Sequence, residues 1–105
     1  MKAKDVKRVR AQKQGFYEDG LLLKVSTSTD AVLRIGIVVS KKVAKHAVRR
    51  NRIRRVLREA TQKESSSFKE GRNLVLIVLP GFELPDFKEA QKVLHSLFQK
   101  ASLFE

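Results

Sequence analysis

Six consecutive apolar residues, Leu74 to Leu79, constrain the fold of this chain more than any other feature of its sequence. Asn73 precedes this run and Pro80 follows it. A strand with one face in water alternates apolar and polar residues, whereas a strand covered on both faces is apolar throughout. The run therefore predicts a central β-strand over residues 73–80, with other elements packed on both faces of its sheet.

Two longer segments carry apolar residues at helical spacing. Residues 86–101 repeat them at intervals of three and four, which predicts a helix with one buried side: Phe87, Ala90, Val93, Leu94, Leu97, Phe98 and Ala101. Residues 45–63 form a second predicted helix, whose stripe of Ile53, Val56, Leu57 and Ala60 spans about 100° of the helical wheel. A shorter helix is expected near the N-terminus, with Asp5 as its N-cap and Gly15 just past its end.

The remaining segments predict three strands, over residues 16–18, 21–27 and 31–40. Asp19-Gly20 supplies the positive φ angles of a tight hairpin turn between the first two, and residues 26–30 form a second turn. The order helix, three strands, helix, strand, helix predicts an α+β sandwich, with helices packed on one sheet. General statistics favour a right-handed crossover for the strand–helix–strand unit from Leu33 to Leu79.

Composition narrows the class of protein. A chain of 105 residues predicts a single domain over residues 1–105. No apolar run approaches the ~20 residues that span a bilayer, and the N-terminal segment lacks the apolar centre of a secretory signal, so we expect a cytoplasmic protein with no membrane partner. Cysteine is absent, and His46 and His95 are not spaced as metal ligands. We therefore expect no metal site on the protein alone. We also expect no bound cofactor and no small-molecule substrate.

The charge of the chain predicts an anionic partner. Lys and Arg number 23 against 11 Asp and Glu, which gives a formal net charge of +12. Self-repulsion of this size destabilises a compact domain unless a partner offsets it. Nucleic acid is the first candidate. An anionic membrane is the second, but the basic segment lacks the wide aromatic face that inserts at an interface.

Arginine occupies six of the ten positions from Arg49 to Arg58. On the helical wheel Arg55 and Arg58 lie nearly opposite the apolar stripe, and Arg52 and Arg54 flank them, whereas Arg49 and Arg50 sit a turn earlier, near the helix start. Like charges three or four residues apart repel one another. Guanidinium groups bind phosphates bidentately, so phosphates would balance this charge. A helix that is merely solvated would usually mix Glu with Lys, and one that reads DNA bases would carry more Asn and Gln than Asn51 alone. A structured RNA, bound through its backbone and shape, fits this pattern better.

Several motifs resemble one family, the protein subunit of bacterial ribonuclease P. The resemblance rests on Ser40-Lys41-Lys42, on Arg50-Asn51-Arg52, on "IRRVLRE" after it, and on the C-terminal "LHSLFQKASL". It covers residues 5–104. It implies an α-β-β-β-α-β-α sandwich with one mixed four-stranded sheet, of the ribosomal protein S5 domain 2-like type. In that fold the β-α-β crossover is left-handed, and we adopt this expectation against the general rule.

The resemblance also implies a function. The family's holoenzyme is an endoribonuclease that removes the 5′ leader of precursor tRNA by phosphodiester hydrolysis. Its RNA subunit holds the catalytic Mg²⁺, so no catalytic residue is expected in the protein. Binding to ribonuclease P RNA is expected at Lys41, Lys42, Lys45, Arg49, Arg50, Asn51, Arg52, Arg54, Arg55 and Arg58. The single-stranded leader is expected in a cleft between the sheet and the first helix, at Val6, Arg10, Lys13, Lys24 and Arg34.

This sequence departs from the family pattern in the expected cleft. Val6 and Arg10 occupy first-helix positions where aromatic residues are common in the family, and Lys24 occupies a strand position where an aromatic is usual. Stacking of a base on an aromatic side chain contributes ~1–3 kcal/mol in single-strand binding. We therefore expect recognition of the leader to be weaker or more electrostatic here.

Two alternatives belong to other classes of protein. A small ribosomal or ribosome-assembly protein would share the charge and the fold without a catalytic role. A stand-alone endonuclease would need clustered carboxylates for two metal ions, and the acids of this chain are scattered along the sequence.

Overall fold

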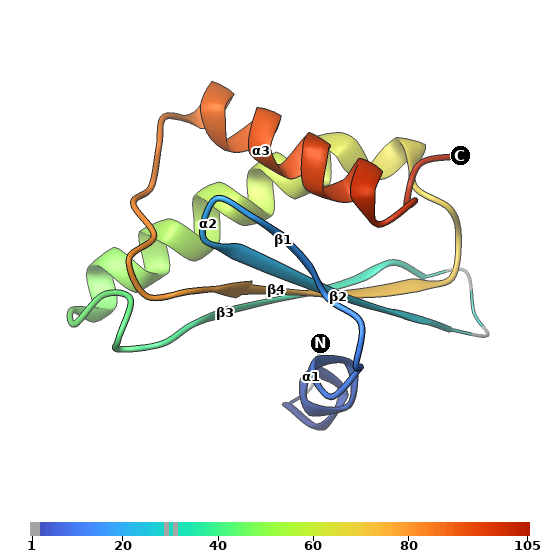
Figure 1. Ribbon diagram of the computed structural model, residues 1–105, viewed down its shortest axis with the longest axis horizontal. Helices are drawn as coiled ribbons and strands as arrows, with labels where there is room; N and C mark the ends of the chain where they lie inside the picture. Colours follow the sequence, from blue (N-terminus) through green and yellow to red (C-terminus); the bar gives the residue numbers. More distant parts are fainter. Residues whose placement is uncertain (1–2, 29, 31) are drawn as a thin grey trace.

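A four-stranded sheet with helices on both faces forms the protein, in a computed structural model that describes residues 3–28, 30 and 32–105 (Figure 1). The strands lie in the order β1-β2-β4-β3. Their bounds are Phe16–Glu18 for β1, Leu21–Thr27 for β2, Arg34–Val39 for β3 and Arg72–Val78 for β4. The helices are α1 (Ala3–Arg10), α2 (Ala47–Glu64), the short 3₁₀ helix η1 (Ser65–Ser67) and α3 (Phe87–Lys100).

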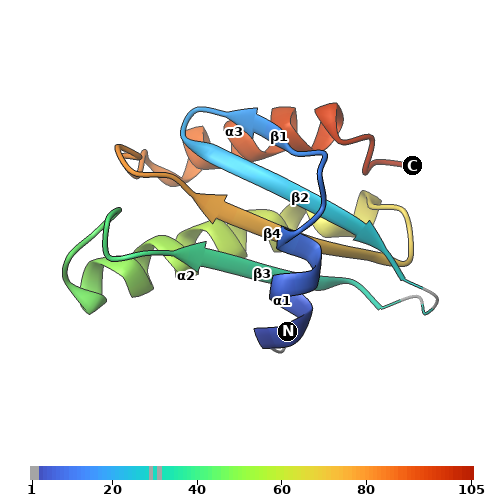
Figure 2. The same ribbon diagram turned by 60° about the horizontal axis from the view of Figure 1, so that its bottom comes forward.

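The sheet is mixed, as expected. β4 pairs antiparallel with β2 and parallel with β3. Helices α2 and α3 cover one face, and α1 lies across the other (Figure 1). Figure 2 shows β3 and β4 running in the same direction with α2 behind the sheet, which makes the β3–α2–β4 crossover left-handed. The handedness implied by the family resemblance is confirmed, and the general rule is wrong for this chain.

The central strand β4 is buried on both faces, as its six apolar residues predicted. Leu74, Leu76 and Val78 join the larger core cluster, which lies between the sheet and helices α2 and α3. Val75 and Ile77 belong to a smaller cluster with Val9 of α1. The strand itself ends at Val78, two residues before the predicted end at Pro80.

The predicted apolar stripes of both long helices face the core. In α2, Ile53, Leu57 and Ala60 are buried, while Val56 is only half-buried. Thr61 is also buried, and its hydroxyl donates a hydrogen bond to the Leu57 carbonyl at 2.8 Å. The stripe of α3 buries Ala90, Leu94, Leu97 and Phe98.

Several helix and strand ends differ from the predicted ones. Asp5 is not an N-cap, because α1 already begins at Ala3. The Asp5 carboxylate lies in the first turn, where the helix dipole favours negative charge, and it is 3.3 Å from the Arg8 guanidinium. Helix α2 begins at Ala47 rather than Lys45. Asp86 precedes α3 as its N-cap. Ala31, where the third strand was predicted to begin, and Thr29 of the predicted turn lie outside the described residues.

Among the described residues, no helix has the length and apolar character needed to span a bilayer.

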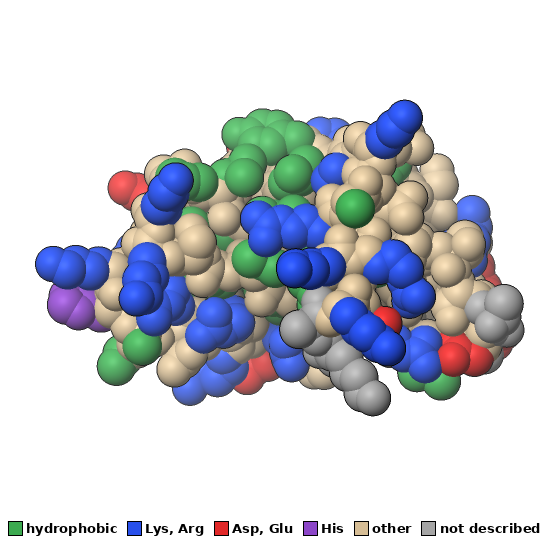
Figure 3. All heavy atoms as spheres, turned by 90° about the horizontal axis from the view of Figure 1, so that it is seen from below, with side chains coloured by type: hydrophobic (Ala, Val, Ile, Leu, Met, Phe, Trp, Pro, Cys, Tyr) green, Lys and Arg blue, Asp and Glu red, His purple; other side chains and the backbone are tan. Residues whose placement is uncertain are grey.

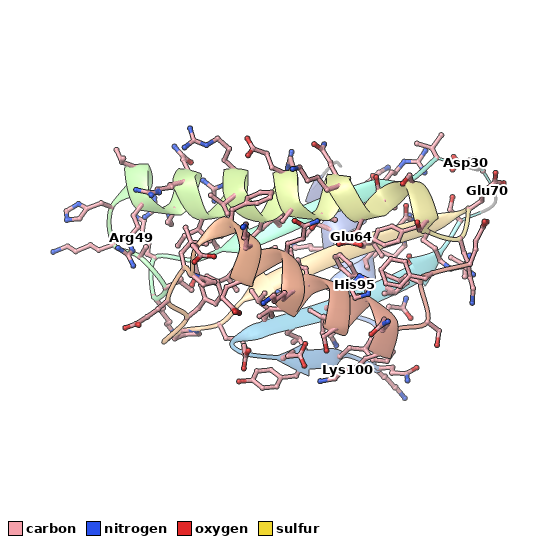
Figure 4. The ribbon with its side chains drawn as sticks, turned by 90° about the horizontal axis from the view of Figure 1, so that it is seen from above. Asp30, Arg49, Glu64, Glu70, His95 and Lys100 are labelled. Carbon is pink, nitrogen blue, oxygen red and sulfur yellow. The ribbon has the colours of Figure 1, made fainter. Side chains whose placement is uncertain are left out.

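The edge strand β1 is tied to α3 by one carboxylate. Glu18 accepts hydrogen bonds from the Ser96 hydroxyl at 2.9 Å, and its carboxylate lies 3.1 Å from the Lys100 ammonium group. Lys100 also donates to the Tyr17 carbonyl, and Figure 4 shows it beside this edge of the sheet. The Ser96 hydrogen bond, assisted by Lys100, lowers the pKa of Glu18 below its ordinary value of 4.5.

This lowered pKa predicts a pH-dependent contribution of Glu18 to stability. A carboxyl whose pKa is lower in the folded state stabilises the fold fully above its unfolded pKa, and this stabilisation is lost as the pH falls through the folded pKa. The free energy of unfolding of the wild type should therefore fall below pH 4.5 more steeply than that of Glu18→Gln. Urea unfolding between pH 7 and pH 2 checks this, and parallel curves for the two proteins would contradict it.

Candidate nucleic-acid interface

The loop between β3 and α2 is held against the helix by Arg50. β3 ends at Val39, and the chain then turns so that the Val43 amide donates to the Ser40 carbonyl at 3.1 Å. The Arg50 guanidinium donates to the carbonyls of Ala44 at 3.0 Å and Lys45 at 2.8 Å. Arg50 is half-buried as a result. These hydrogen bonds give Arg50 a positioning role for the loop, and its expected contact with RNA stays a prediction.

Replacing Arg50 should therefore lower the free energy of unfolding, whereas replacing Arg52 should leave it nearly unchanged. Arg50→Ala removes both hydrogen bonds to loop carbonyls, and we expect a loss of about 1–2 kcal/mol in the free energy of unfolding. Arg52 is exposed, and Arg52→Ala should change stability by less than about 0.5 kcal/mol. Urea denaturation of both variants measures the difference. Equal stability of the two variants would show that the Arg50 contacts contribute nothing.

Seven exposed cations lie on this loop and on α2, and we call them together the cationic face: Lys41, Lys42, Lys45, Arg49, Arg52, Arg55 and Arg58. Among the described residues, none of the seven lies within ion-pair distance of an acidic side chain. Seen from above in Figure 4, side chains project from the outer side of α2, with Arg49 at its N-terminal end. The prediction that Arg55 and Arg58 are exposed is confirmed.

The start of α2 concentrates positive charge in an unfavourable place. Its first turn contains no acidic residue, and its N-cap, His46, makes no side-chain capping bond. The free backbone N–H groups of a helix start carry partial positive charge, so Arg49 next to them raises the electrostatic energy of the isolated protein. An anion bound here would relieve that repulsion. The protein's own acids do not supply it among the described residues.

Arg54 and Asn51 contact each other instead of projecting freely. The Arg54 guanidinium donates to the side-chain oxygen of Asn51, three residues earlier on the same helix. Arg54 is half-buried, whereas Asn51 is exposed. The pair orients the amide of Asn51, which leaves its NH₂ group as the part of the side chain that can donate to a partner.

A second candidate surface lies on the opposite face of the sheet, next to α1. A hollow of about 610 Å³ is lined by Arg8, Gln12, Val25, Ser26, Thr27, Ser28 and Asn73. Ser26, Asn73 and Arg34 are register partners on the neighbouring strands β2, β4 and β3. Asn73 is 5% exposed and its Oδ1 atom has no hydrogen-bond partner in the described part of the chain. Arg34 was predicted to lie in the leader cleft, whereas Ser26 and Asn73 were not, although alternation along β4 places Asn73 on the same face as Val75.

The five residues predicted to line the leader cleft are not equally free to bind RNA. Val6 packs on the small core cluster, and the ammonium group of Lys24 donates to the Gln12 carbonyl. Arg10 and Lys13 are exposed. Arg34 forms a bidentate pair with Asp30, at 2.9 and 2.8 Å, which holds the pKa of the Asp30 carboxyl well below its usual range. A phosphate would therefore compete with Asp30 for Arg34.

Positive charge is not confined to α2. Figure 3 shows the face that carries α1, with Lys and Arg side chains spread across it and few acidic ones. The exposed cations of α1 and of the turn after it include Arg8, Arg10 and Lys13. The two candidate surfaces, the cationic face and the hollow beside α1, could thus contact different parts of one extended polyanion.

The two histidines are far apart in the fold. His95 of α3 lies 3.1 Å from the Glu64 carboxylate at the end of α2 (Figure 4), whereas His46 caps the start of α2. Within the described ranges, no three His, Asp or Glu side chains come close enough to hold a metal ion. The two histidines are therefore not placed to serve each other as acid–base partners.

Comparison with known proteins assigns the family. The sequence model of the ribonuclease P family matches residues 1–102. The ribonuclease P protein component of a Pseudanabaena species is 36% identical over 94% of this chain and 86% of its own length. The chain belongs to the ribonuclease P protein family. Ribonuclease P is an endonuclease, and members of this family are its protein component.

Other family members agree in sequence and in fold. The protein component of Herpetosiphon aurantiacus is 33% identical over 96% of this chain and 81% of its own length. That of Bacillus velezensis is 40% identical, and the chain spans 61% of its length. The solved ribonuclease P protein of Staphylococcus aureus superposes with a TM-score of 0.84 over 100% of this chain and 95% of its own, at 23% identity. That of Thermotoga maritima gives 0.82 at 22% identity, over 95% of this chain and 94% of its own. These likenesses show the fold.

Proposed function

We propose that this protein binds ribonuclease P RNA through the cationic face and assists that RNA in removing the 5′ leader of precursor tRNA. The observation that carries the proposal is that seven exposed cations on one loop and one helix have no acidic partner among the described residues. Phosphates are the natural partner for such a surface, because guanidinium groups bind them bidentately.

The protein's contribution to the reaction is binding and positioning. Because no three His, Asp or Glu side chains gather in the described part of the chain, we assign the catalytic Mg²⁺ to the RNA subunit and no catalytic residue to the protein. Neutralising RNA phosphates lowers the repulsion between the RNA subunit and its RNA substrate. The protein should therefore reduce the Mg²⁺ concentration that the reaction needs.

We assign the hollow beside α1 to the single-stranded 5′ leader. Arg8 on its rim, with Arg10 and Lys13 nearby, supplies positive charge for the leader phosphates. Ser26 and Asn73 on its floor supply polar atoms for bases or riboses. Among the described residues, no aromatic side chain lines this hollow, which supports the expectation that leader binding depends mainly on charge.

A reconstituted reaction tests the proposal. Copurification from the source cells followed by sequencing of the bound RNA identifies the partner. Precursor tRNA cleavage by that RNA is then measured across Mg²⁺ concentrations, with and without the protein. We expect the protein to lower the Mg²⁺ requirement and to cleave nothing by itself.

The other outcomes distinguish the alternatives. Recovery of ribosomal RNA in place of ribonuclease P RNA would indicate a ribosomal or ribosome-assembly protein. Cleavage by protein without added RNA would indicate a stand-alone nuclease. An unchanged Mg²⁺ requirement would remove the proposed assisting role.

A further inference from the structure

The first half of α2 and the segment that leads into α3 enclose a hollow of about 360 Å³. This volume falls within the range of about 300–1,000 Å³ that is usual for ligand sites. Its lining residues are Arg49, Arg52, Ile53, Leu84, Pro85 and Asp86, and we call it the α2 hollow. Figure 4 shows Arg49 at this end of α2, on the side of the segment that precedes α3.

The two walls of the α2 hollow differ in chemistry. Arg49 and Arg52 form a cationic wall, and both belong to the exposed set without acidic partners in the described ranges. The segment before α3 contributes an apolar wall of Leu84 and Pro85, both half-buried, and Ile53 of α2 adds an apolar side chain that is 1% exposed. A cationic wall facing an apolar wall matches a nucleotide, which joins a charged phosphate to a flat ring.

Asp86 adds a fixed acceptor to the same hollow. Its Oδ1 atom accepts the Glu89 amide at 2.9 Å as the N-cap of α3, so the carboxylate is held in place. A carboxylate repels phosphate but accepts hydrogen bonds from the exocyclic amino group of a base. The base is therefore expected on the Asp86 side and the phosphate on the arginine side.

A neighbouring hollow, which shares Pro85 as a lining residue, has the opposite charge. It measures about 180 Å³, has Leu21, Leu57 and Phe82 among its apolar lining residues, and carries three acids, Asp19, Glu83 and Glu89. These carboxylates would repel a polyanion. Of these two neighbouring hollows, only the α2 hollow presents positive charge to an RNA.

We propose that the α2 hollow binds one unstacked nucleotide of the partner RNA. The base lies against Leu84 and Pro85, and its phosphate contacts Arg49 and Arg52. This inference rests on the proposed RNA-binding function and adds to it: the interface extends from α2 to the segment before α3, and it includes a contact that does not depend on charge.

The salt dependence of RNA binding distinguishes the contribution of the apolar wall from that of the cationic wall. The dissociation constant of the full-length protein for the RNA that copurifies with it is measured across salt concentrations. Leu84→Ser should weaken binding about fivefold at every salt concentration, because it removes an apolar contact. Arg52→Gln should weaken binding and also lower the slope of log K against log salt by roughly 0.7–0.9, the contribution of one phosphate.

Val32→Ser is the matched control. Val32 is 54% exposed before β3, at the opposite end of that strand from the start of α2, so the same kind of change there should leave binding unaltered. Leu84→Phe provides a second variant, because it keeps an apolar wall and should retain at least wild-type affinity. Thermal unfolding followed by circular dichroism verifies that each variant is folded.

Base-specific chemical modification of the bound RNA gives an independent readout. One unpaired base should be protected by the wild type and by Val32→Ser but exposed in the Leu84→Ser complex. If the wild type binds and Leu84→Ser behaves like Val32→Ser in both assays, the inference is overturned while the proposed function stands. If the wild type does not bind the RNA, the proposed function fails and the inference fails with it.

Discussion

Replacing Arg52, Arg55 and Arg58 together by glutamine is expected to weaken RNA binding by about 100-fold or more at moderate salt. Each exposed arginine that contacts a phosphate contributes about 1 kcal/mol, and ~1.4 kcal/mol corresponds to a factor of ten in affinity. The free protein should keep its stability, because all three side chains are exposed.

The dependence of binding on salt should change as well. If the cationic face neutralises about six phosphates on a mainly helical RNA, log K falls with log salt at a slope near −4 to −5. Removing three of these contacts should reduce the magnitude of the slope by about 2. Titrations by filter binding or fluorescence anisotropy at several salt concentrations measure both quantities.

A charge-matched control separates contact from general attraction. This control also removes three positive charges, but from exposed positions at the C-terminal end of α2 and on α3: Lys63→Gln/Lys88→Gln/Lys92→Gln. It should weaken binding by only a few fold, through the long-range field alone. Equal losses in the two triple variants would mean that the cationic face is not the binding surface.

Leu57→Ala is expected to lower the free energy of unfolding by about 2–5 kcal/mol. Leu57 is 0% exposed in the core cluster between α2 and the sheet, so shortening its side chain leaves a cavity. Small domains are stable by only about 5–15 kcal/mol, which makes this a large fraction of the total. Alanine favours helix more than leucine does, so helix propensity does not account for the loss.

Urea denaturation of Leu57→Ala beside Val48→Ala measures this effect. Val48 lies on the same helix at 82% exposure, and its truncation should change the free energy of unfolding by less than about 0.5 kcal/mol. A loss below 1 kcal/mol for Leu57→Ala would mean that α2 does not pack on the sheet as described.

Local patterns in the sequence were enough to predict the elements and their buried sides. The apolar run at Leu74–Leu79 identified the central strand, and the stripes in α2 and α3 identified the faces that pack on it. Asp19-Gly20 identified the hairpin turn, where both residues have positive φ angles of 46° and 82°. These features depend on the period of a strand or helix and on the conformational freedom of single residues, which are visible over a few positions.

The ends of the elements were less predictable. Asp5 and Asp86 are both acids near a helix start, yet one lies inside the first turn and the other is the N-cap. The side-chain types that cap a helix also occur in its first turn, because both positions benefit from the helix dipole. Composition alone does not distinguish the two.

The sequence by itself determined that this chain carries a helix with one apolar and one cationic side, and hence that it needs an anionic partner. Only the tertiary structure decided how each charged side chain is used. Arg50 turns back to loop carbonyls, Arg34 pairs with Asp30, and Arg49 and Arg52 face an apolar wall contributed by a segment more than thirty residues away. Arg34 and Arg50 contact groups only four to six residues away, but those groups lie in loops, whose conformation leaves no periodic signal in the sequence. The α2 hollow joins segments that are distant in the sequence, and contacts of this kind leave no periodic signal either.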